Sequence, residues 1–264
     1  MFCDKRGSGP AVVLIHGLGA YSYSWRNTVA ALSAYTTYAV DLLGFGQSAA
    51  PAGFAYTAKA QAEAVAAFMK DQGLSSPVII GHSMGGGVCL NLAELAGKDG
   101  VPSLSKMILV APAASPPRYP FGAGKMTTLA AAVELPDFDA HAQKVGRDLV
   151  TTILHGAYKD RSRVTPAQID GYAKGLSKRD QIQAFLRHLA NLNEISFSPS
   201  QLSGIKIKTL IIWGKDDGFL EPARADKLKG KLPDASLEWI DDCGHIPQEE
   251  RPEKTNDAIV KFLK

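Results

Sequence analysis

The sequence predicts an α/β fold in which a mostly parallel sheet carries helices on both faces and a helical insertion interrupts its later part. Three observations predict this fold. Short β-rich runs alternate with longer helical patterns over residues 11–110, as in parallel sheets covered by crossover helices. Residues 111–199 then show helical patterns without a convincing strand. Near residue 209 the alternation resumes and continues to the last helix.

The first part of the chain alternates regularly between the two element types. Strands are expected at residues 11–15, 37–40, 78–80 and 106–110, and helices from Trp25, over 58–72 and from Met84. Thr57 stands where a side chain caps the second of these helices, and Gly73 stands where a glycine ends it. This order predicts one sheet layered between helices.

The alternation stops at residues 111–117, which contain three prolines, and helical patterns follow at 140–154 and 178–192. Two more strands are expected at 209–213 and 237–240, with helices from Pro222 and over 252–263. Helices inserted between two sheet strands form a lid. We therefore expect a core built from residues 1–112 and 200–264, and a helical cap over 113–199.

The most informative stretch is Gly81-His82-Ser83-Met84-Gly85, which joins a predicted strand directly to a predicted helix. A serine on so tight a turn is lifted into the open above the sheet, and the flanking glycines remove the Cβ atoms that would crowd it. The same turn aims the next backbone N–H, that of Met84, at an oxyanion. The alternative is a glycine-rich connection, since the bare pattern occurs by chance in about one protein in ten. The strand before it and the helix after it favour the nucleophile.

A serine nucleophile needs a base and a third group that orients the base, and in this type of fold both follow it along the chain. His245 lies in a loop after the last strand, at the sheet edge where Ser83 lies. Asp216 and Asp217 follow the strand at 209–213, and only one of two adjacent side chains points inward. The other histidines after Ser83 lie within the insertion, which favours structural roles for them.

Two glycine-containing turns complete the catalytic edge. His16-Gly17-Leu18-Gly19 closes the first strand, where the backbone N–H of Leu18 supplies the second oxyanion donor. Gly44-x-Gly46-x-x-Ala49 matches a relaxed dinucleotide fingerprint, but Ala50-Pro51-Ala52-Gly53 follows it where a phosphate-binding helix should begin. We read this second turn as a shaped loop, and the sequence predicts no cofactor.

Composition narrows the class further. The 264 residues are 45% hydrophobic, enough for one large core, and 29 basic against 26 acidic residues leave a net charge of only +3. Such a balance argues against a nucleic-acid partner. Cys3, Cys89 and Cys243 are widely spaced and predict neither a disulfide framework nor a metal site. No apolar run has signal-peptide or membrane-span length, so we expect a cytoplasmic protein without a membrane span.

These motifs together resemble the α/β-hydrolase superfamily over nearly the whole chain. The markers are His16-Gly17, Asp41 with Gly44-x-Gly46-x-Ser48, the Ser83 elbow, Trp213-Gly214-x-x-Asp217, and Gly244-His245 before Glu250-Arg251-Pro252-Glu253. In that family the acid stands three residues after the glycine, so the resemblance selects Asp217. It also implies an eight-stranded sheet whose second strand is antiparallel. Because only ten residues precede Ala11, we expect the first strand to be absent and the second to be shortened.

The resemblance implies a serine hydrolase with the triad Ser83, His245 and Asp217 that cleaves carboxylic esters through an acyl-enzyme. We expect a small, largely apolar ester, because the insertion is rich in apolar residues, most of which should pack the lid against the core; these are Tyr119, Phe121, Leu129, Phe138, Leu149, Tyr158, Phe185 and Leu189. A serine at the elbow argues against relatives that use aspartate there, such as dehalogenases and epoxide hydrolases.

Four alternatives use the same fold. Carbon–carbon bond hydrolases share the lid and triad, but they usually carry a serine after the His-Gly pair and an asparagine before the nucleophile, where this chain has Leu18 and His82. Perhydrolases and lyases use the same triad. Small-molecule receptors on this fold bind a ligand under the lid and turn it over slowly or never, so sustained turnover separates them from an esterase.

Overall fold

The computed structural model describes residues 1–116 and 123–264. Within them, seven strands form one sheet in the order β1-β3-β2-β4-β5-β6-β7. The strands are β1 (Phe2–Arg6), β2 (Ala11–Ile15), β3 (Thr36–Asp41), β4 (Val78–His82), β5 (Met107–Val110), β6 (Thr209–Gly214) and β7 (Ala235–Ile240). All neighbours pair in parallel except β1, which runs antiparallel to β3.

The sheet is buried on both faces because its central strands are apolar runs. Alternate residues of β2 enter different cores: Val13 and Ile15 pack on one side, and Val12 and Leu14 on the other. Burial on two sides explains why the sequence shows continuous apolar runs here instead of an alternation of polar and apolar residues.

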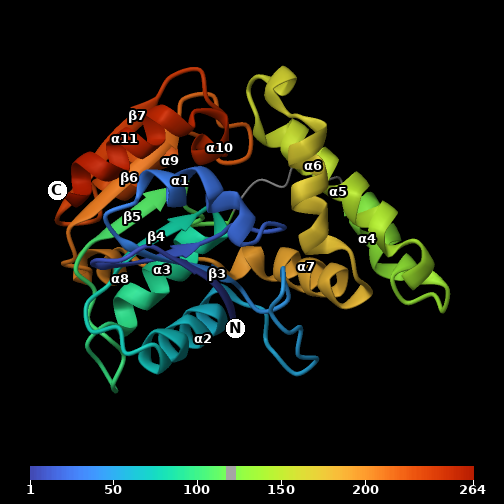
Figure 1. The fold of residues 1–264 in the computed structure, drawn as a ribbon, viewed down its shortest axis with the longest axis horizontal. Helices are drawn as coiled ribbons and strands as arrows, with labels where there is room; N and C mark the ends of the chain where they lie inside the picture. Colours follow the sequence, from blue (N-terminus) through green and yellow to red (C-terminus); the bar gives the residue numbers. More distant parts are fainter. Residues whose placement is uncertain (117–122) are drawn as a thin grey trace.

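Helices cover each face of the sheet (Figure 1). On one side lie α2 (Ala58–Asp71) and α3 (Met84–Leu95), which pack against each other, and α1 (Arg26–Ala31) and α11 (Pro252–Leu263) cover the other. The remaining core helices are α8 (Pro199–Gly204), α9 (Ala223–Lys229) and α10 (Pro247–Glu250). Thr57 Oγ1 accepts a hydrogen bond from the N–H of Ala60, and Gly73 has a φ of +66°, so both predicted ends of α2 are confirmed.

Among the described residues, four helices lie between β5 and α8, to one side of the sheet (Figure 1). They are α4 (Ala123–Ala132), α5 (Ala142–Ala157), α6 (Pro166–Ala173) and α7 (Arg179–Asn191). Short 3₁₀ turns lie between them at Phe138–Ala140, Arg161–Arg163 and Lys174–Leu176, and another, Leu192–Glu194, follows α7. The patterns at 140–154 and 178–192 therefore predicted α5 and α7. We did not predict α4 or α6. A capping box between Thr165 and Gln168 starts α6, with Pro166 at its first turn.

The N-terminal edge agrees with the expected departure from eight strands. The described sheet has seven, and the antiparallel strand is present as β1, five residues that all pair with β3. A further 3₁₀ turn, Ser22–Trp25, precedes α1.

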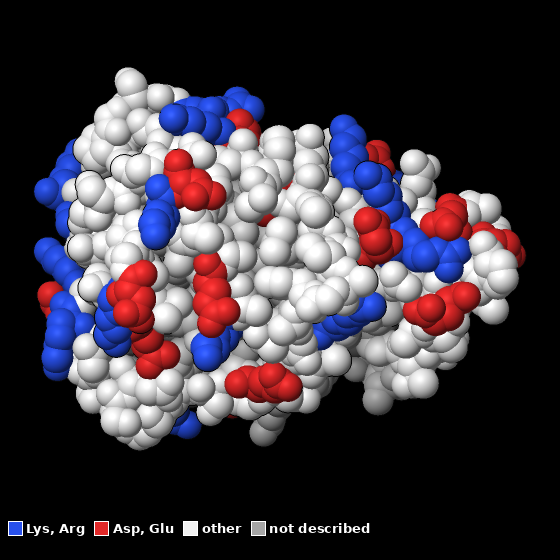
Figure 2. Space-filling view, turned by 90° about the horizontal axis from the view of Figure 1, so that it is seen from below, with Lys and Arg blue, Asp and Glu red and all other residues white. Residues whose placement is uncertain are grey.

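None of the described helices combines the length and the apolar character that crossing a bilayer requires. Figure 2 shows Lys and Arg interspersed with Asp and Glu over one face of the molecule, without an extended area of a single sign.

Candidate active site

Ser83 occupies a strained turn between β4 and α3. Its φ is 52° and its ψ is −117°, a backbone conformation that a non-glycine residue adopts only when its surroundings impose it. Two neighbours must be glycine for the turn to fit. A Cβ on Gly81 would meet the carbonyl oxygen of Gly85 at 2.3 Å, and one on Gly85 would meet that of Ile15 at 2.3 Å. Both positions therefore require glycine, but the added Cβ atoms would clash with the backbone of Gly85 and of Ile15 and not with Ser83, which the sequence analysis expected them to crowd.

The three predicted triad residues form one hydrogen-bonded chain. His245 Nε2 lies 2.9 Å from Ser83 Oγ, and His245 Nδ1 lies 2.8 Å from Asp217 Oδ2. Because a carboxylate only accepts, Nδ1 carries the proton and Nε2 is free to accept one from the Ser83 hydroxyl. Ser83 follows β4, Asp217 follows β6 and His245 follows β7, so all three lie at the carboxyl edge of the sheet.

Asp217 is buried and its carboxylate is fully engaged. Oδ2 accepts a second hydrogen bond from Trp213 Nε1, and Oδ1 accepts from the backbone N–H groups of Phe219 and Leu220. Burial alone would raise the pKa of Asp217, but the charge and hydrogen bond of His245 and the two N–H donors bring it below the ordinary value. Asp216 instead faces outward and pairs with Lys159 at 3.0 Å. The structure thus brings Asp217 to the site and leaves Asp216 on the surface.

His82, the residue before Ser83, is buried beside His245. Burial, reinforced by the nearby His245, lowers the pKa of His82 to about 3, so its ring is neutral. His188, within α7, is also buried, stacked on Phe45 and at 3.0 Å from Gln61 Nε2. It does not line the pocket beside Ser83.

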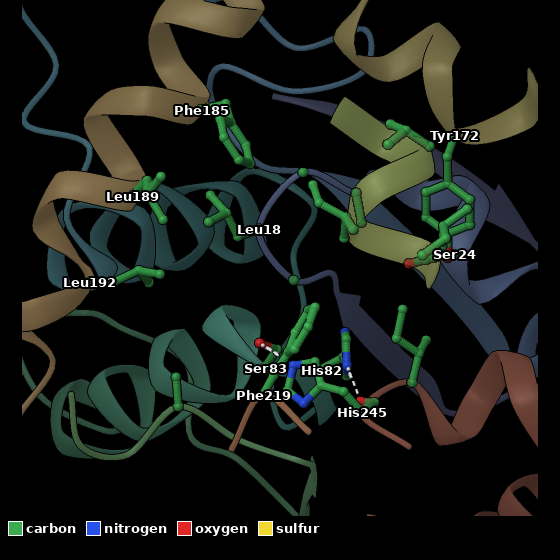
Figure 3. A pocket seen from close by; sticks show the side chains of 18 of the residues that line it. Leu18, Ser24, His82, Ser83, Tyr172, Phe185, Leu189, Leu192, Phe219 and His245 are labelled. Carbon is green, nitrogen blue, oxygen red and sulfur yellow. Dashed lines mark hydrogen bonds between the residues drawn. The ribbon is translucent and has the colours of Figure 1, made fainter. Parts of the chain in front are cut away.

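Leu18 and Met84, the residues predicted to supply the oxyanion donors, lie on two different segments near Ser83. Met84 is the first residue of α3, where a backbone N–H has no partner within the helix. Leu18 lines the pocket next to Ser83 (Figure 3). Its loop is braced by His16, whose Nδ1 donates to the carbonyl oxygen of Gly17 at 2.8 Å and whose Nε2 accepts from the N–H of Leu42 at 2.9 Å.

The pocket above Ser83 encloses about 90 Å³ and is mostly apolar (Figure 3). Its wall includes apolar side chains from α5, α7 and the loop after β6, namely Val150, Ile153, Leu154, Phe185, Leu189, Phe219 and Leu220. No Lys, Arg, Asp or Glu is among the described residues that line it. The hydroxyl of Tyr172 points away, donating to Glu249 Oε1 at 2.8 Å, so Tyr172 offers the pocket only its ring.

Sequence reasoning found part of this wall. Phe185 and Leu189 line the pocket, whereas Leu129, Leu149 and Tyr158 pack within the main core cluster or against it, and Phe138 packs in a separate cluster of the inserted helices. Tyr119 and Phe121 lie outside the described residues. Val150, Ile153 and Leu154 were missed, although their spacing of three and four residues marks one face of a helix.

The loop after β3 is shaped by Asp41, as expected for a structural turn. Asp41 Oδ1 accepts from the N–H of Ser22 at 2.7 Å and Oδ2 from that of Gln47 at 2.8 Å. No helix begins at this loop, because the next one starts at Ala58. In the part of the chain that the structure describes, no three His, Cys, Asp or Glu side chains gather as metal ligands would.

Comparison with known proteins agrees with this geometry. The model of the alpha/beta hydrolase fold family matches residues 10–252, which is most of the chain. The chain belongs to the alpha/beta hydrolase fold family. Family membership accounts for the mostly parallel sheet, the strand-turn-helix at Ser83 and the insertion between β5 and β6, and it makes hydrolase activity the supported class.

Relatives in this alpha/beta hydrolase family match nearly end to end. An uncharacterized hydrolase, YugF of Bacillus subtilis (strain 168), is 28% identical over 96% of this chain and 89% of its own. The 2-hydroxy-6-oxo-6-phenylhexa-2,4-dienoate hydrolase of Comamonas testosteroni is 26% identical over 99% of this chain and 90% of its own. The structure of a thermophilic esterase from Thermogutta terrifontis superposes with a TM-score of 0.79 at 24% identity, covering 99% of this chain and 92% of that one, which shows a shared fold.

Proposed function

We propose that this protein is a serine hydrolase that cleaves carboxylic esters of small, largely apolar molecules. The observation that carries the proposal is the unbroken hydrogen-bonded chain from Ser83 through His245 to Asp217 at the floor of an uncharged pocket. A hydroxyl so placed has a base within reach and the base has a fixed tautomer, which is the arrangement that activates serine.

The proposed mechanism follows from these contacts. Ser83 Oγ attacks the ester carbonyl carbon while its proton passes to His245 Nε2, and Asp217 stabilises the imidazolium that forms. The N–H groups of Leu18 and Met84 bind the oxyanion. His245 then gives its proton to the departing alkoxide, leaving an acyl group on Ser83. Water, deprotonated by His245, attacks the acyl carbon, the bond to Ser83 breaks as His245 returns this proton to Ser83 Oγ, and the carboxylic acid leaves.

The pocket supports a small substrate. A cavity of about 90 Å³ is far below the range of about 300–1,000 Å³ typical of sites for drug-sized ligands. Its walls come from both the core and the inserted helices, so we propose that residues 113–199 act as a cap over the core of 1–112 and 200–264. In this arrangement α5 and α7 set the length and width of the acyl or alcohol group that fits.

Carbon–carbon bond hydrolysis is the main competing reaction. The Comamonas testosteroni relative is named for a dienoate, whose carboxylate would need a cationic or strong hydrogen-bonding partner if buried. No Lys or Arg is among the described residues of this pocket wall, which favours a neutral ester. The pocket chemistry therefore supports the ester over the dienoate.

The test is steady-state hydrolysis of p-nitrophenyl esters over a series of acyl lengths, with Ser83→Ala protein as the blank. Sustained turnover is expected, together with a loss in kcat on the order of 10⁶ in Ser83→Ala, as for removal of other triad nucleophiles. A loss below about tenfold would exclude Ser83 as the nucleophile, since even partial triad defects cost far more. A single burst without turnover would instead indicate a receptor-like protein, and no Ser83-dependent signal would favour carbon–carbon bond hydrolysis or lyase chemistry.

A further inference from the structure

Glu250 has a buried side-chain carboxylate. It ends α10, is 1% exposed, and none of the described Lys or Arg side chains forms an ion pair with it. Three backbone N–H groups bind the carboxylate instead. Oε2 accepts from Gly244 at 2.7 Å and from Lys159 at 3.2 Å, and Oε1 accepts from Asp160 at 2.9 Å. Hydrogen bonds to an ionised acceptor are stronger than those between neutral groups, so this one side chain joins its donors firmly.

The three N–H groups that bind Glu250 belong to two segments that form different parts of the site. Gly244 directly precedes His245, whereas Lys159 and Asp160 follow α5, the helix that walls the pocket through Val150, Ile153 and Leu154. Glu250 therefore bridges the loop of the candidate base and a wall of the pocket, across 90 and 91 residues of sequence.

The two segments touch directly as well. The backbone N–H of His245 donates to the carbonyl oxygen of Ala157 at 2.6 Å. A Cβ on Gly244 would lie 2.2 Å from that same oxygen, so the backbones approach as closely as a glycine allows. Any shift of Gly244 away from Glu250 would consequently change the path of the chain into His245.

We propose that Glu250 is a positioning residue for His245: it fixes the backbone before the base against the end of α5 and thereby sets the distance between His245 Nε2 and Ser83 Oγ. The proposal rests on the role assigned to His245 under the proposed function. A misplacement of about 1 Å in a reacting group can slow a reaction by about 10²-fold, so loss of the three hydrogen bonds should slow every step that uses the base. Glu250 would then couple the position of His245 to that of α5, which forms part of the pocket wall.

The test measures how fast Ser83 reacts with a small alkyl fluorophosphonate, followed by intact mass. In this reaction the Ser83 Oγ–P bond forms, the P–F bond breaks, fluoride leaves, and the serine proton passes to His245. The rate constant is taken as a function of pH for the wild type, Glu250→Ala and Glu250→Gln. Because a rate constant reports only the molecules that react, and the final amplitude reports the folded fraction, partial misfolding does not obscure the result.

Glu250→Ala should lower the plateau rate constant at least tenfold, because all three N–H groups lose their acceptor. Glu250→Gln keeps one oxygen, so it should recover most of the rate. Two controls are matched to the alternatives. Asp242→Asn removes only the exposed ion pair to Lys159, which joins the same two segments as Glu250 does. Ile259→Ala removes buried side-chain atoms from the core between the sheet and α11, so it lowers stability without touching either segment. Both should keep the wild-type rate constant, and Ile259→Ala should do so despite a lower Tm.

A plateau rate constant of Glu250→Ala within twofold of wild type would overturn the proposal. So would a shift of the pH midpoint with an unchanged plateau, since that result would mean that Glu250 acts only through its charge. A fall of equal size in Ile259→Ala would overturn it too, because general destabilisation would then explain the loss. The ester proposal can be wrong while this one is right. If the wild type labels rapidly at Ser83 but hydrolyses no ester, the labelling rate constants of the Glu250 variants can still be compared with that of the wild type.

Discussion

His82 Nε2 lies 2.9 Å from the carbonyl oxygen of His245, so the residue before the nucleophile binds the backbone of the base. A carbonyl oxygen only accepts, which places the proton of the neutral His82 ring on Nε2. The elbow and the His245 loop are thus joined twice, once through the side chains of Ser83 and His245 and once through this bond. Protonation of His82 would place a buried charge beside the base.

Buried neutral histidines make the free energy of unfolding depend on pH. The pKa of His82 is lowered to about 3 and that of His188 to about 4, mainly by burial, against an ordinary value of 6.5. Between the unfolded and folded pKa values the unfolded chain binds more protons, so stability decreases as the pH falls below about 6.5. Each histidine contributes a slope of about 1.4 kcal/mol per pH unit within its window.

His188→Leu tests this dependence, because His188 lies away from the pocket. Urea unfolding from pH 6 to pH 4.5 should show a slope shallower than wild type by about 1.4 kcal/mol per pH unit. The difference in slope is the readout, since the substitution also changes stability at every pH. Parallel curves would show that His188 titrates alike in the folded and unfolded chains.

Asp217→Asn should lower kcat by about 10⁴, the size of effect that follows from a wrong imidazole tautomer. The N–H groups of Phe219 and Leu220 would keep the amide oxygen on their side, so the new NH₂ would face His245 Nδ1. His245 Nδ1 would then have to accept a hydrogen bond, so the ring proton would move to Nε2, which faces Ser83 and could no longer take its proton. The matched control is Asp216→Asn, whose half-exposed partner is Lys159. It should change kcat less than twofold, and comparable losses in both variants would contradict the assignment.

Gly85→Ala should destabilise the protein by about 3 kcal/mol or more, at the upper end of overpacking effects. The added Cβ would meet the carbonyl oxygens of Ile15 at 2.3 Å and His16 at 2.5 Å, and backbone atoms of a central strand have little room to move. Gly53→Ala is the control, since nothing lies within 4 Å of its Cβ position. Urea midpoints measure both. Equal midpoints would mean that the turn around Ser83 can accommodate the added methyl group without loss of stability.

Leu189→Ala should move the acyl-length optimum of ester hydrolysis toward longer chains. Leu189 lines the pocket from α7 (Figure 3), and each methylene that fits changes kcat/KM by roughly tenfold or more. The ratio of kcat/KM for hexanoate to that for acetate is the quantity to compare. Leu186→Ala, on the same helix but outside the pocket wall, should leave that ratio unchanged. An unaltered ratio in Leu189→Ala would mean that the acyl group does not contact Leu189.

The features that the sequence predicted well are those encoded locally. The bounds of α11 agree with the predicted 252–263, because proline at its start and an apolar period define it without help from distant residues. The order of the triad residues is equally local, since each follows its own strand. The choice of Asp217 over Asp216 needed the family resemblance, and the structure supplies the physical reason in the N–H groups of Phe219 and Leu220.

The features that the sequence did not predict depend on distant contacts. The helix α6 has only eight residues, and its Tyr172 becomes a wall of the pocket through a hydrogen bond to Glu249, 77 residues away. The sequence identifies Glu250 only as a family marker, because the three N–H groups that bind it come from two loops that meet only in the folded chain. Neither hydrophobic periodicity nor secondary-structure propensity predicts contacts between loops that are distant in the sequence.

The strands β5 and β6 are neighbours in the sheet, with Met107 opposite Thr209, although α4, α5, α6 and α7 separate them in the chain. In topological terms the insertion is a lengthened crossover between adjacent parallel strands, completed by α8 before the chain re-enters the sheet. The entropy of closing a connection grows only by about 0.6 kcal/mol for each doubling of its length. Such a connection can lengthen, shorten or exchange its helices while the strands on either side keep their pairing. New substrate ranges are therefore open to this scaffold without redesign of its core.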